Sequence, residues 1–256
     1  MCWKRKKPDP MLPASRRALL FAINKYGGGN DLNGCINDQK DFIAKLNALF
    51  PGFDIRAWKD SEVTTGKFIS ELDSAIGVLR PGDTLIVHYS GHGTTVPDRS
   101  GDEPDEEDEA LYVINGTVSD DIIGKSLQMI PDGATVVLFF DSCFSGTITR
   151  AVRKIRFVPN PEMAGRKIIK RRHFAKSFEM NHLVFSGCSE DQTSADAYIN
   201  GRYNGAFTFY ALYNLRPGIT FNGWYSEIRK YLPSKDFDQI PTLEGPNYLS
   251  NKVVFI

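Results

Sequence analysis

Two apolar runs, Thr84-Leu-Ile-Val-His-Tyr89 and Ala134-Thr-Val-Val-Leu-Phe-Phe140, decide the fold predicted for this chain. Both are almost continuously apolar, which is typical of strands buried on both faces rather than on one. A third run of this kind, Arg17-Ala-Leu-Leu-Phe-Ala-Ile-Asn24, lies upstream. We therefore predict a parallel sheet whose central strands are covered on both faces.

Amphipathic segments separate these runs. Residues 35–50 and 64–79 carry apolar side chains at helical spacing, and a Pro-Gly pair follows each within two residues. Strands that alternate with helices imply right-handed crossovers, so the predicted fold class is an α/β sandwich with a mostly parallel central sheet and helices on both faces. Further helices are predicted over 120–129, 206–215 and 224–231, strands over 53–58 and 182–186, and a hairpin near 111–114.

Composition excludes several classes of protein. The 256 residues include 31 Lys+Arg and 31 Asp+Glu, and this balance weighs against a general nucleic-acid binder. No apolar run reaches the ~18–20 residues of a membrane helix. The four cysteines form no Cys-x-x-Cys pair, and residues 1–15 lack the apolar core of a secretory signal. We therefore expect no nucleic-acid or membrane partner, no structural zinc and a cytoplasmic protein.

The charges are unevenly distributed. An acidic loop is predicted from Asp98 to Glu109, and a basic stretch follows Ser145 and ends near Lys176. We divide the chain into a basic tail, 1–16, and one domain, 17–256. That domain comprises a larger part, 17–149, a basic linker, 150–181, and a smaller part, 182–256. The basic stretch contains Arg153, Lys154, Arg156, Arg166, Lys167, Lys170, Arg171 and Arg172.

Reactive residues follow the two decisive strands. One strand leads into Ser90-Gly-His-Gly93 and the other into Asp141-Ser-Cys-Phe-Ser-Gly146, and ligands of open α/β sheets bind at the carboxyl ends of the strands. An imidazole beside a thiol lowers its pKa and carries its proton, which predicts His92 as general base and Cys143 as nucleophile. The amides of Gly93 and Cys143 are candidate oxyanion donors. Taken singly, Cys143 could be an inert buried thiol and His92 a surface histidine, but their joint placement favours catalysis.

These two blocks resemble the His and Cys blocks of metacaspases, within the caspase-like cysteine peptidases. A histidine about 50 residues upstream of the cysteine fits the caspase order. The resemblance runs from about Arg17 to the C-terminus and is closest to compact, prokaryotic-type members without a long prodomain. Matching blocks also occur at Ala22-Ile-Asn24 with Tyr26, Leu32-Asn-Gly-Cys-Ile-Asn-Asp38, Gly101-Asp-Glu103, Ser186-Gly-Cys-Ser-Glu-Asp-Gln-Thr-Ser-Ala-Asp196 and Gly205-Ala206.

The resemblance implies a caspase-like three-layer sandwich and cleavage after Arg or Lys. The family's pocket for the basic side chain at P1, the residue before the cut bond, is lined by positions that match Cys35, Asp38, Ser90 and Asp141. Two carboxylates that converge on one site suit a buried guanidinium. The implied chemistry proceeds through a thioester acyl-enzyme and requires no third triad carboxylate and no cofactor. The expected partners are protein or peptide substrates, and the expected state is a monomer.

Calcium control is less well supported. Many metacaspases bind calcium through aspartates, and two of those positions match Asp120 and Asp121. A further ligand position, seven residues after Cys143, holds Arg150 in this chain. A cation there removes an oxygen donor and repels the ion, which weighs against calcium activation. For the acidic loop we favour a solvated loop over a weak calcium site.

The basic linker allows two interpretations. It is either a solvated segment or, in an enzyme that cuts after basic residues, a substrate for self-processing. Two alternative functions also stay open: a catalytically idle caspase-like scaffold that binds partner proteins, and a related peptidase with another P1 choice. An Asp-cleaving pocket should carry basic residues, whereas this one offers Asp38 and Asp141.

Overall fold

The computed structural model describes residues 13–97, 107–143, 154–163, 180–188 and 195–256, and predictions made for other residues lie outside it. A six-stranded sheet forms the centre, in the order β12-β9-β7-β3-β1-β2. All neighbouring strands are parallel except β12, which is antiparallel to β9. The predicted α/β class with a mostly parallel sheet is therefore confirmed. The strands are β1 (Arg16–Ala22), β2 (Phe53–Lys59), β3 (Thr84–Ser90), β7 (Thr135–Asp141), β9 (Leu183–Ser186) and β12 (Thr242–Glu244).

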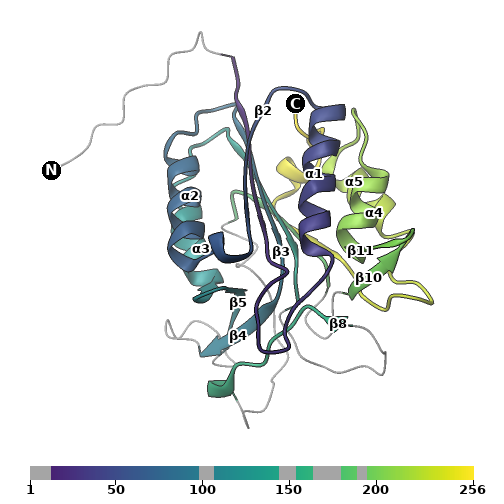
Figure 1. Ribbon diagram of the computed structural model, residues 1–256. Helices are drawn as coiled ribbons and strands as arrows, with labels where there is room; N and C mark the ends of the chain where they lie inside the picture. Colours follow the sequence, from purple (N-terminus) through teal and green to yellow (C-terminus); the bar gives the residue numbers. More distant parts are fainter. Residues whose placement is uncertain (1–12, 98–106, 144–153, 164–179, 189–194) are drawn as a thin grey trace, which may run out of the picture.

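Helices cover both faces of this sheet (Figure 1). Helices α2 (Thr65–Gly77) and α3 (Asp120–Leu127) lie on one face, and α1 (Cys35–Leu49), α4 (Ala206–Asn214) and α5 (Phe221–Ile228) lie on the other. Phe139 and Phe140 of β7 point to opposite faces and belong to the two separate cores. Both side chains are fully buried, which explains why the strand sequence does not alternate. The short elements η1 (Asp60–Glu62), η2 (Pro161–Met163) and α6 (Asn247–Ser250) complete the helical set of the described residues.

Helix boundaries follow local capping. Thr64 precedes α2, and its hydroxyl accepts a hydrogen bond from the amide of Lys67 at 3.2 Å. The helix predicted over 224–231 instead begins at Phe221, because the Thr220 hydroxyl accepts from the Gly223 amide at 3.0 Å and caps an earlier turn. Among the described residues, no helix combines the length and the apolarity needed to cross a membrane.

Two small sheets flank the carboxyl edge of the central sheet. The first contains β4 (Gly93–Pro97), β5 (Glu107–Val113) and β6 (Gly116–Ser119), and β5 with β6 forms the predicted hairpin. The prediction that residues 107–109 belong to a solvated loop is wrong. These residues pair with β4, and Asp108 is only 5% exposed.

The second small sheet has the order β11-β10-β8, with β8 (Lys154–Ile155), β10 (Ala195–Ile199) and β11 (Arg202–Gly205). None of these strands was predicted from the sequence. Strand β8 lies within the predicted basic linker, and the next residue, Arg156, has no exposed surface. A solvated segment is therefore the wrong description of this part of the linker.

Candidate active site

Adjacent parallel strands bring the two reactive blocks together. Ala22 pairs with Ser90, and Ser90 pairs with Asp141, so β1, β3 and β7 end at the same level. His92 follows Ser90 by two residues, and Cys143 follows Asp141 by two residues. Since neighbouring strands lie about 4.8 Å apart, this equal offset puts both residues at one edge of the sheet. The sequence argument from strand ends predicted this edge.

A glycine and two tyrosines hold the loop that carries His92. A Cβ atom on Gly91 would lie 2.5 Å from Tyr26 Oη and 2.6 Å from Tyr89 Oη, so a side chain there would displace both tyrosines. Tyr26 Oη accepts a hydrogen bond from the His92 amide at 2.8 Å. The Tyr26 ring also lies 4.6 Å from the imidazole, centroid to centroid. Tyr26 therefore fixes both the backbone and the ring of His92.

The hydrogen bonding of His92 defines its tautomer. Nε2 lies 2.7 Å from the carbonyl oxygen of Asn30. A carbonyl can only accept, so Nε2 carries the proton and Nδ1 presents a lone pair. Nδ1 is buried and makes no hydrogen bond of normal geometry with the described residues, although the ring also interacts with the backbone of Arg156. Burial lowers the pKa of His92 to about 4, although the bond to Asn30 acts against it, so the ring is neutral at pH 7.

Two backbone amides converge on one carbonyl oxygen. The N–H groups of Gly93 and Cys143 both donate to the carbonyl of Arg156, at 2.9 and 3.2 Å. Two amides aimed at one oxygen have the arrangement of an oxyanion hole, and these are the two donors that the sequence suggested. The Cys143 side chain is fully buried. The carbonyl of Arg156 thus occupies the place at which the two amides point.

The side chain of the same residue fills a pocket of acidic and hydroxyl groups. Arg156 Nη2 lies 2.8 Å from Asp38 Oδ2, and Nη1 lies 3.2 Å from Asp141 Oδ1. Nη1 also donates to Ser90 Oγ at 2.8 Å and to the Asp141 carbonyl at 3.1 Å. Three of the four predicted P1-pocket residues therefore contact a single guanidinium.

Residues from the C-terminal part orient the two pocket carboxylates. The Gly205 amide donates to both oxygens of Asp38, at 2.9 and 3.0 Å. The amide and hydroxyl of Thr208 donate to Asp141 Oδ2, at 2.9 and 2.7 Å. A Cβ on Gly205 would lie 2.6 Å from Arg156 Nη1, so only glycine leaves room for the guanidinium. Neither Gly205 nor Thr208 was predicted as a site residue.

Asp196 is a third carboxylate that the sequence reasoning missed. Its Oδ1 accepts from the Gly34 amide at 2.8 Å and lies 3.5 Å from Arg156 Nη2, while Oδ2 accepts from the Asn33 amide at 2.9 Å. It is 3% exposed. It stands on β10, which pairs with β8, so its place depends on a strand pairing without a local signal. Asp196 is the last residue of the block 186–196, one of those on which the family resemblance rests, and this was the one signal in the sequence that pointed to it.

Cys35 lies beside this cluster but bonds differently. Its amide donates to Asn24 Oδ1 at 2.9 Å, and burial raises the pKa of its thiol, so the thiol stays protonated. Burial also raises the pKa of Asp38; the Arg156 guanidinium acts against this effect, and the Asp141 carboxylate adds to it. A site with three buried carboxylates therefore requires a cation.

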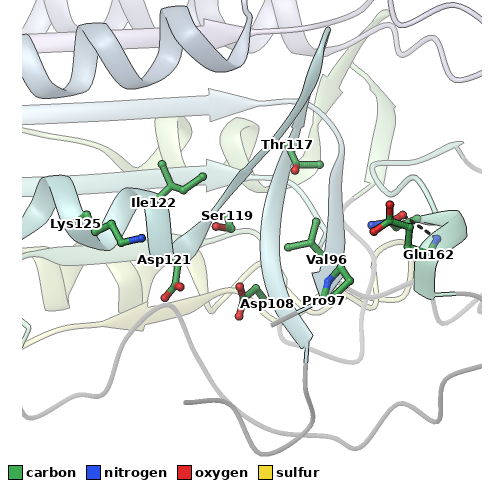
Figure 2. A pocket seen from close by; sticks show the side chains of 10 residues that line it. Val96, Pro97, Asp108, Thr117, Ser119, Asp121, Ile122, Lys125 and Glu162 are labelled. Carbon is green, nitrogen blue, oxygen red and sulfur yellow. Dashed lines mark hydrogen bonds between the residues drawn. The ribbon is translucent and has the colours of Figure 1, made fainter. Parts of the chain in front are cut away.

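The candidate calcium residues lie elsewhere. Asp120 and Asp121 begin α3, and Asp121 lines a pocket of about 410 Å³ together with Asp108, Ser119 and Glu162 (Figure 2). In the part of the chain that the structure describes, no group of three or more His, Cys, Asp or Glu side chains is placed to hold a metal ion. These residues alone do not form a complete calcium site, and Arg150 lies outside the described ranges.

Comparison with known proteins gives the family context of this geometry. Residues 15–250 match the family model described as "Caspase domain". The chain is 28% identical to metacaspase-1 of Coccidioides immitis and 26% identical to metacaspase-1 of Meyerozyma guilliermondii. Each alignment covers 94% of the present chain. It spans 63% and 72% of those two relatives.

Solved structures agree on the fold. The crystal structure of protein GSU0716 from Geobacter sulfurreducens superposes with a TM-score of 0.72 at 25% identity, covering 94% of this chain and 98% of that one. Caspase-1 from Spodoptera frugiperda superposes with a TM-score of 0.63 at 12% identity, covering 97% and 95% of the two chains. The predicted caspase-like sandwich is therefore confirmed.

Proposed function

Because the chain belongs to the caspase domain family of cysteine-type peptidases, we propose that it is an endopeptidase that cuts after Arg or Lys with a Cys143–His92 dyad. One observation carries this proposal. The Arg156 side chain is fully buried against Asp38, Ser90 and Asp141, while its own carbonyl lies between the Gly93 and Cys143 amides. A P1 residue must occupy both places at once.

Charge supports a basic P1 residue. A buried carboxylate without a partner costs several kcal/mol. Asp38, Asp141 and Asp196 are all at most 3% exposed, and they meet at one guanidinium. An acidic P1 side chain would add a fourth negative charge, whereas Arg or Lys offsets this cost. The alternative of an Asp-cleaving peptidase is disfavoured for that reason.

The proposed reaction uses groups that the chain itself supplies. His92 Nδ1 accepts the proton of the Cys143 thiol, and the thiolate attacks the P1 carbonyl carbon. The amides of Gly93 and Cys143 stabilise the oxyanion. The imidazolium returns its proton to the departing amine, and water hydrolyses the thioester. The Nε2 bond to Asn30 keeps Nδ1 free for both transfers. No cofactor takes part in these steps, and calcium activation stays a proposal without a complete set of ligands among the described residues.

The alternative of an idle scaffold also has an observation in its favour. Arg156 fills the pocket and Cys143 has no exposed surface, so this conformation offers no room for the side chain of another protein. The two functions differ in one requirement: a peptidase must release Arg156 from the pocket, whereas a scaffold need not.

The proposal also covers self-processing, the class of substrate, the oligomeric state and the cellular location. Self-processing within the basic linker, 150–181, fits an enzyme that cuts after basic residues. The same proposal includes protein or peptide substrates and a monomeric state. The described cysteines, Cys35, Cys143 and Cys188, form no disulfide, which fits the proposed cytoplasmic location.

The test compares peptides that differ only at P1. We expect hydrolysis of Arg and Lys peptides, none of the Asp peptide, and loss of all activity in Cys143→Ala. Asp38→Asn should raise KM for the Arg peptide by about 10- to 100-fold, since a charge-assisted bond to the guanidinium is weakened. The control, Asp132→Asn at an exposed position outside the pocket, should leave KM unchanged. Parallel assays with calcium and with a chelator measure any calcium requirement.

No hydrolysis of any basic peptide would contradict the proposal, provided that Arg156→Ala, whose pocket is vacated, is equally inert. Cleavage of the Asp peptide would support the alternative P1 choice.

A further inference from the structure

We propose that the bond between Arg156 and Phe157 is the chain's own processing site and is cut within the same molecule. The inference rests on the proposed function, because it needs an active Cys143. It adds a defined bond and a defined mode of recognition, which depend on how residues 154–158 lie in the cleft.

The residues before the bond bind as an added strand. Strand β8 pairs with β10 in antiparallel register, Ile155 opposite Ala195 and Lys154 opposite Asp196. Addition of an extended segment to a strand edge is a general way in which peptides are recognised, because main-chain bonds fix the backbone irrespective of sequence. Lys154 and Ile155 therefore occupy the positions of residues three and two before a cut.

The residues after the bond are held by a different strand. Phe157 forms a parallel bridge with Gly93, and the Val158 amide donates to the Gly93 carbonyl at 3.0 Å. Val158 is 9% exposed, and Asn160 Nδ2 donates to the Thr95 carbonyl at 3.0 Å farther along β4. The chain is thus fixed on both sides of one peptide bond.

The carbonyl between these two anchored segments is the one at the oxyanion donors. Gly93 contributes its amide to Arg156 and its carbonyl to Val158, so one glycine holds both sides of the Arg156–Phe157 bond. Among the described residues, Arg156 is the basic residue whose side chain enters the carboxylate pocket. Pocket, strand pairing and oxyanion donors thus select the same bond.

The balanced reaction consumes one water. Cys143 Sγ forms a thioester with the Arg156 carbonyl carbon, the bond to Phe157 nitrogen breaks, and His92 supplies the proton for the new amine. Hydrolysis then leaves a carboxylate on Arg156 and the free thiol. Nucleophile and bond belong to one chain, so their effective concentration does not depend on dilution.

The experiment follows the full chain by intact mass and N-terminal sequencing. We expect a new terminus, Phe157-Val-Pro-Asn160, in the wild type, formed with a first-order rate constant that is the same over about a 100-fold dilution. Cys143→Ala should stay intact. Arg156→Lys should still be cut at this bond, because it retains the cation, whereas Arg156→Gln should not.

Two variants separate cleavage from folding. Phe157→Pro leaves Arg156 in place but changes the leaving nitrogen, so the chain should stay intact with an unchanged Tm. Arg153→Gln is the matched control, three residues earlier in the same basic stretch, and should be cut at the usual rate.

Each other outcome is decisive. A chain cut only after another basic residue, or cut at a rate that rises with protein concentration, overturns the inference. So does an uncut wild type, if Arg156→Ala hydrolyses Arg peptides with Cys143; the proposed function then stands, and the Arg156 segment is an inhibitor. If no variant hydrolyses peptides, the proposed function itself fails.

Discussion

His88 and His92 lie four residues apart on one strand and the turn after it, and both are buried, yet their surroundings differ. His88 lies within β3 against the rings of Phe42 and Phe139, at centroid distances of 4.8 and 5.8 Å. Neither of its ring nitrogens has a partner among the described residues. In His92, by contrast, Nε2 donates a hydrogen bond to the carbonyl of Asn30, and Nδ1 presents a lone pair. Burial alone therefore does not distinguish the proposed catalytic base, His92, from the core histidine, His88; the hydrogen bond that orients Nε2 of His92 does.

The largest expected difference between the two histidines is in catalysis. His92→Ala should lower kcat/KM for an Arg peptide by about 10²–10⁴-fold, since the general base and acid is lost. His88→Leu should leave it within about twofold, because the side chain packs against Phe42 and Phe139 and makes no hydrogen bond with the described residues. Steady-state kinetics on both variants measures this. Equal losses in the two would mean that the histidines act only through folding.

A second difference concerns acid stability. Burial lowers the pKa of His88 to about 3 from an ordinary 6.5. Between these values the unfolded chain binds a proton that the folded chain does not, so the free energy of unfolding decreases as pH falls. From pH 7 to pH 4 this one group should cost about 3 kcal/mol.

Urea unfolding at pH 7, 5 and 4 measures this dependence. The slope of stability against pH should be smaller in His88→Leu than in the wild type. His92 and His182, whose pKa values burial also lowers to about 4, contribute with the same sign in both proteins. Identical slopes in wild type and His88→Leu would show that His88 keeps an ordinary pKa.

At pH 7 the free energy of unfolding of His88→Leu measures what it costs to bury the two ring nitrogens without hydrogen bonds. His88 is a core histidine whose two ring nitrogens make no hydrogen bond with the described residues. Leucine has a similar volume and no polar atoms, so His88→Leu should raise the free energy of unfolding by about 1 kcal/mol. A loss of several kcal/mol would indicate a hydrogen bond that stabilises the ring.

The smallest effect is expected from Tyr26→Phe. The variant keeps the ring against His92 but removes the hydroxyl that accepts from the His92 amide. The loss of about 1 kcal/mol corresponds to a fivefold decrease in kcat with KM unchanged. A shift in KM instead would place Tyr26 in substrate binding.

The sequence predicted the parts of the site that follow long buried strands. Ser90, His92, Asp141 and Cys143 were placed correctly at one sheet edge because parallel strands in register end together. Short strands were not predicted. Strand β8 has two residues, and such a segment carries no periodicity that could distinguish it from a loop.

Arg156 shows this limit most clearly. In the sequence it is one of ten Lys and Arg residues between Arg150 and Lys176, a stretch without pattern, and charge favours a solvated position for all of them. Its burial depends on three carboxylates from α1, β7 and β10, which only the tertiary fold brings together. The same reason explains why Asp196 was missed.

The bonds from Gly205 and Thr208 to the pocket aspartates have a consequence for protein synthesis. A nascent chain on the ribosome exposes His92 and Cys143 well before residues 205–208 leave the exit tunnel. Until then Asp38 and Asp141 lack the amides that hold them. The proposed specificity pocket is therefore completed only after residues 205–208 have been made and exposed, later in synthesis than the segments that carry His92 and Cys143.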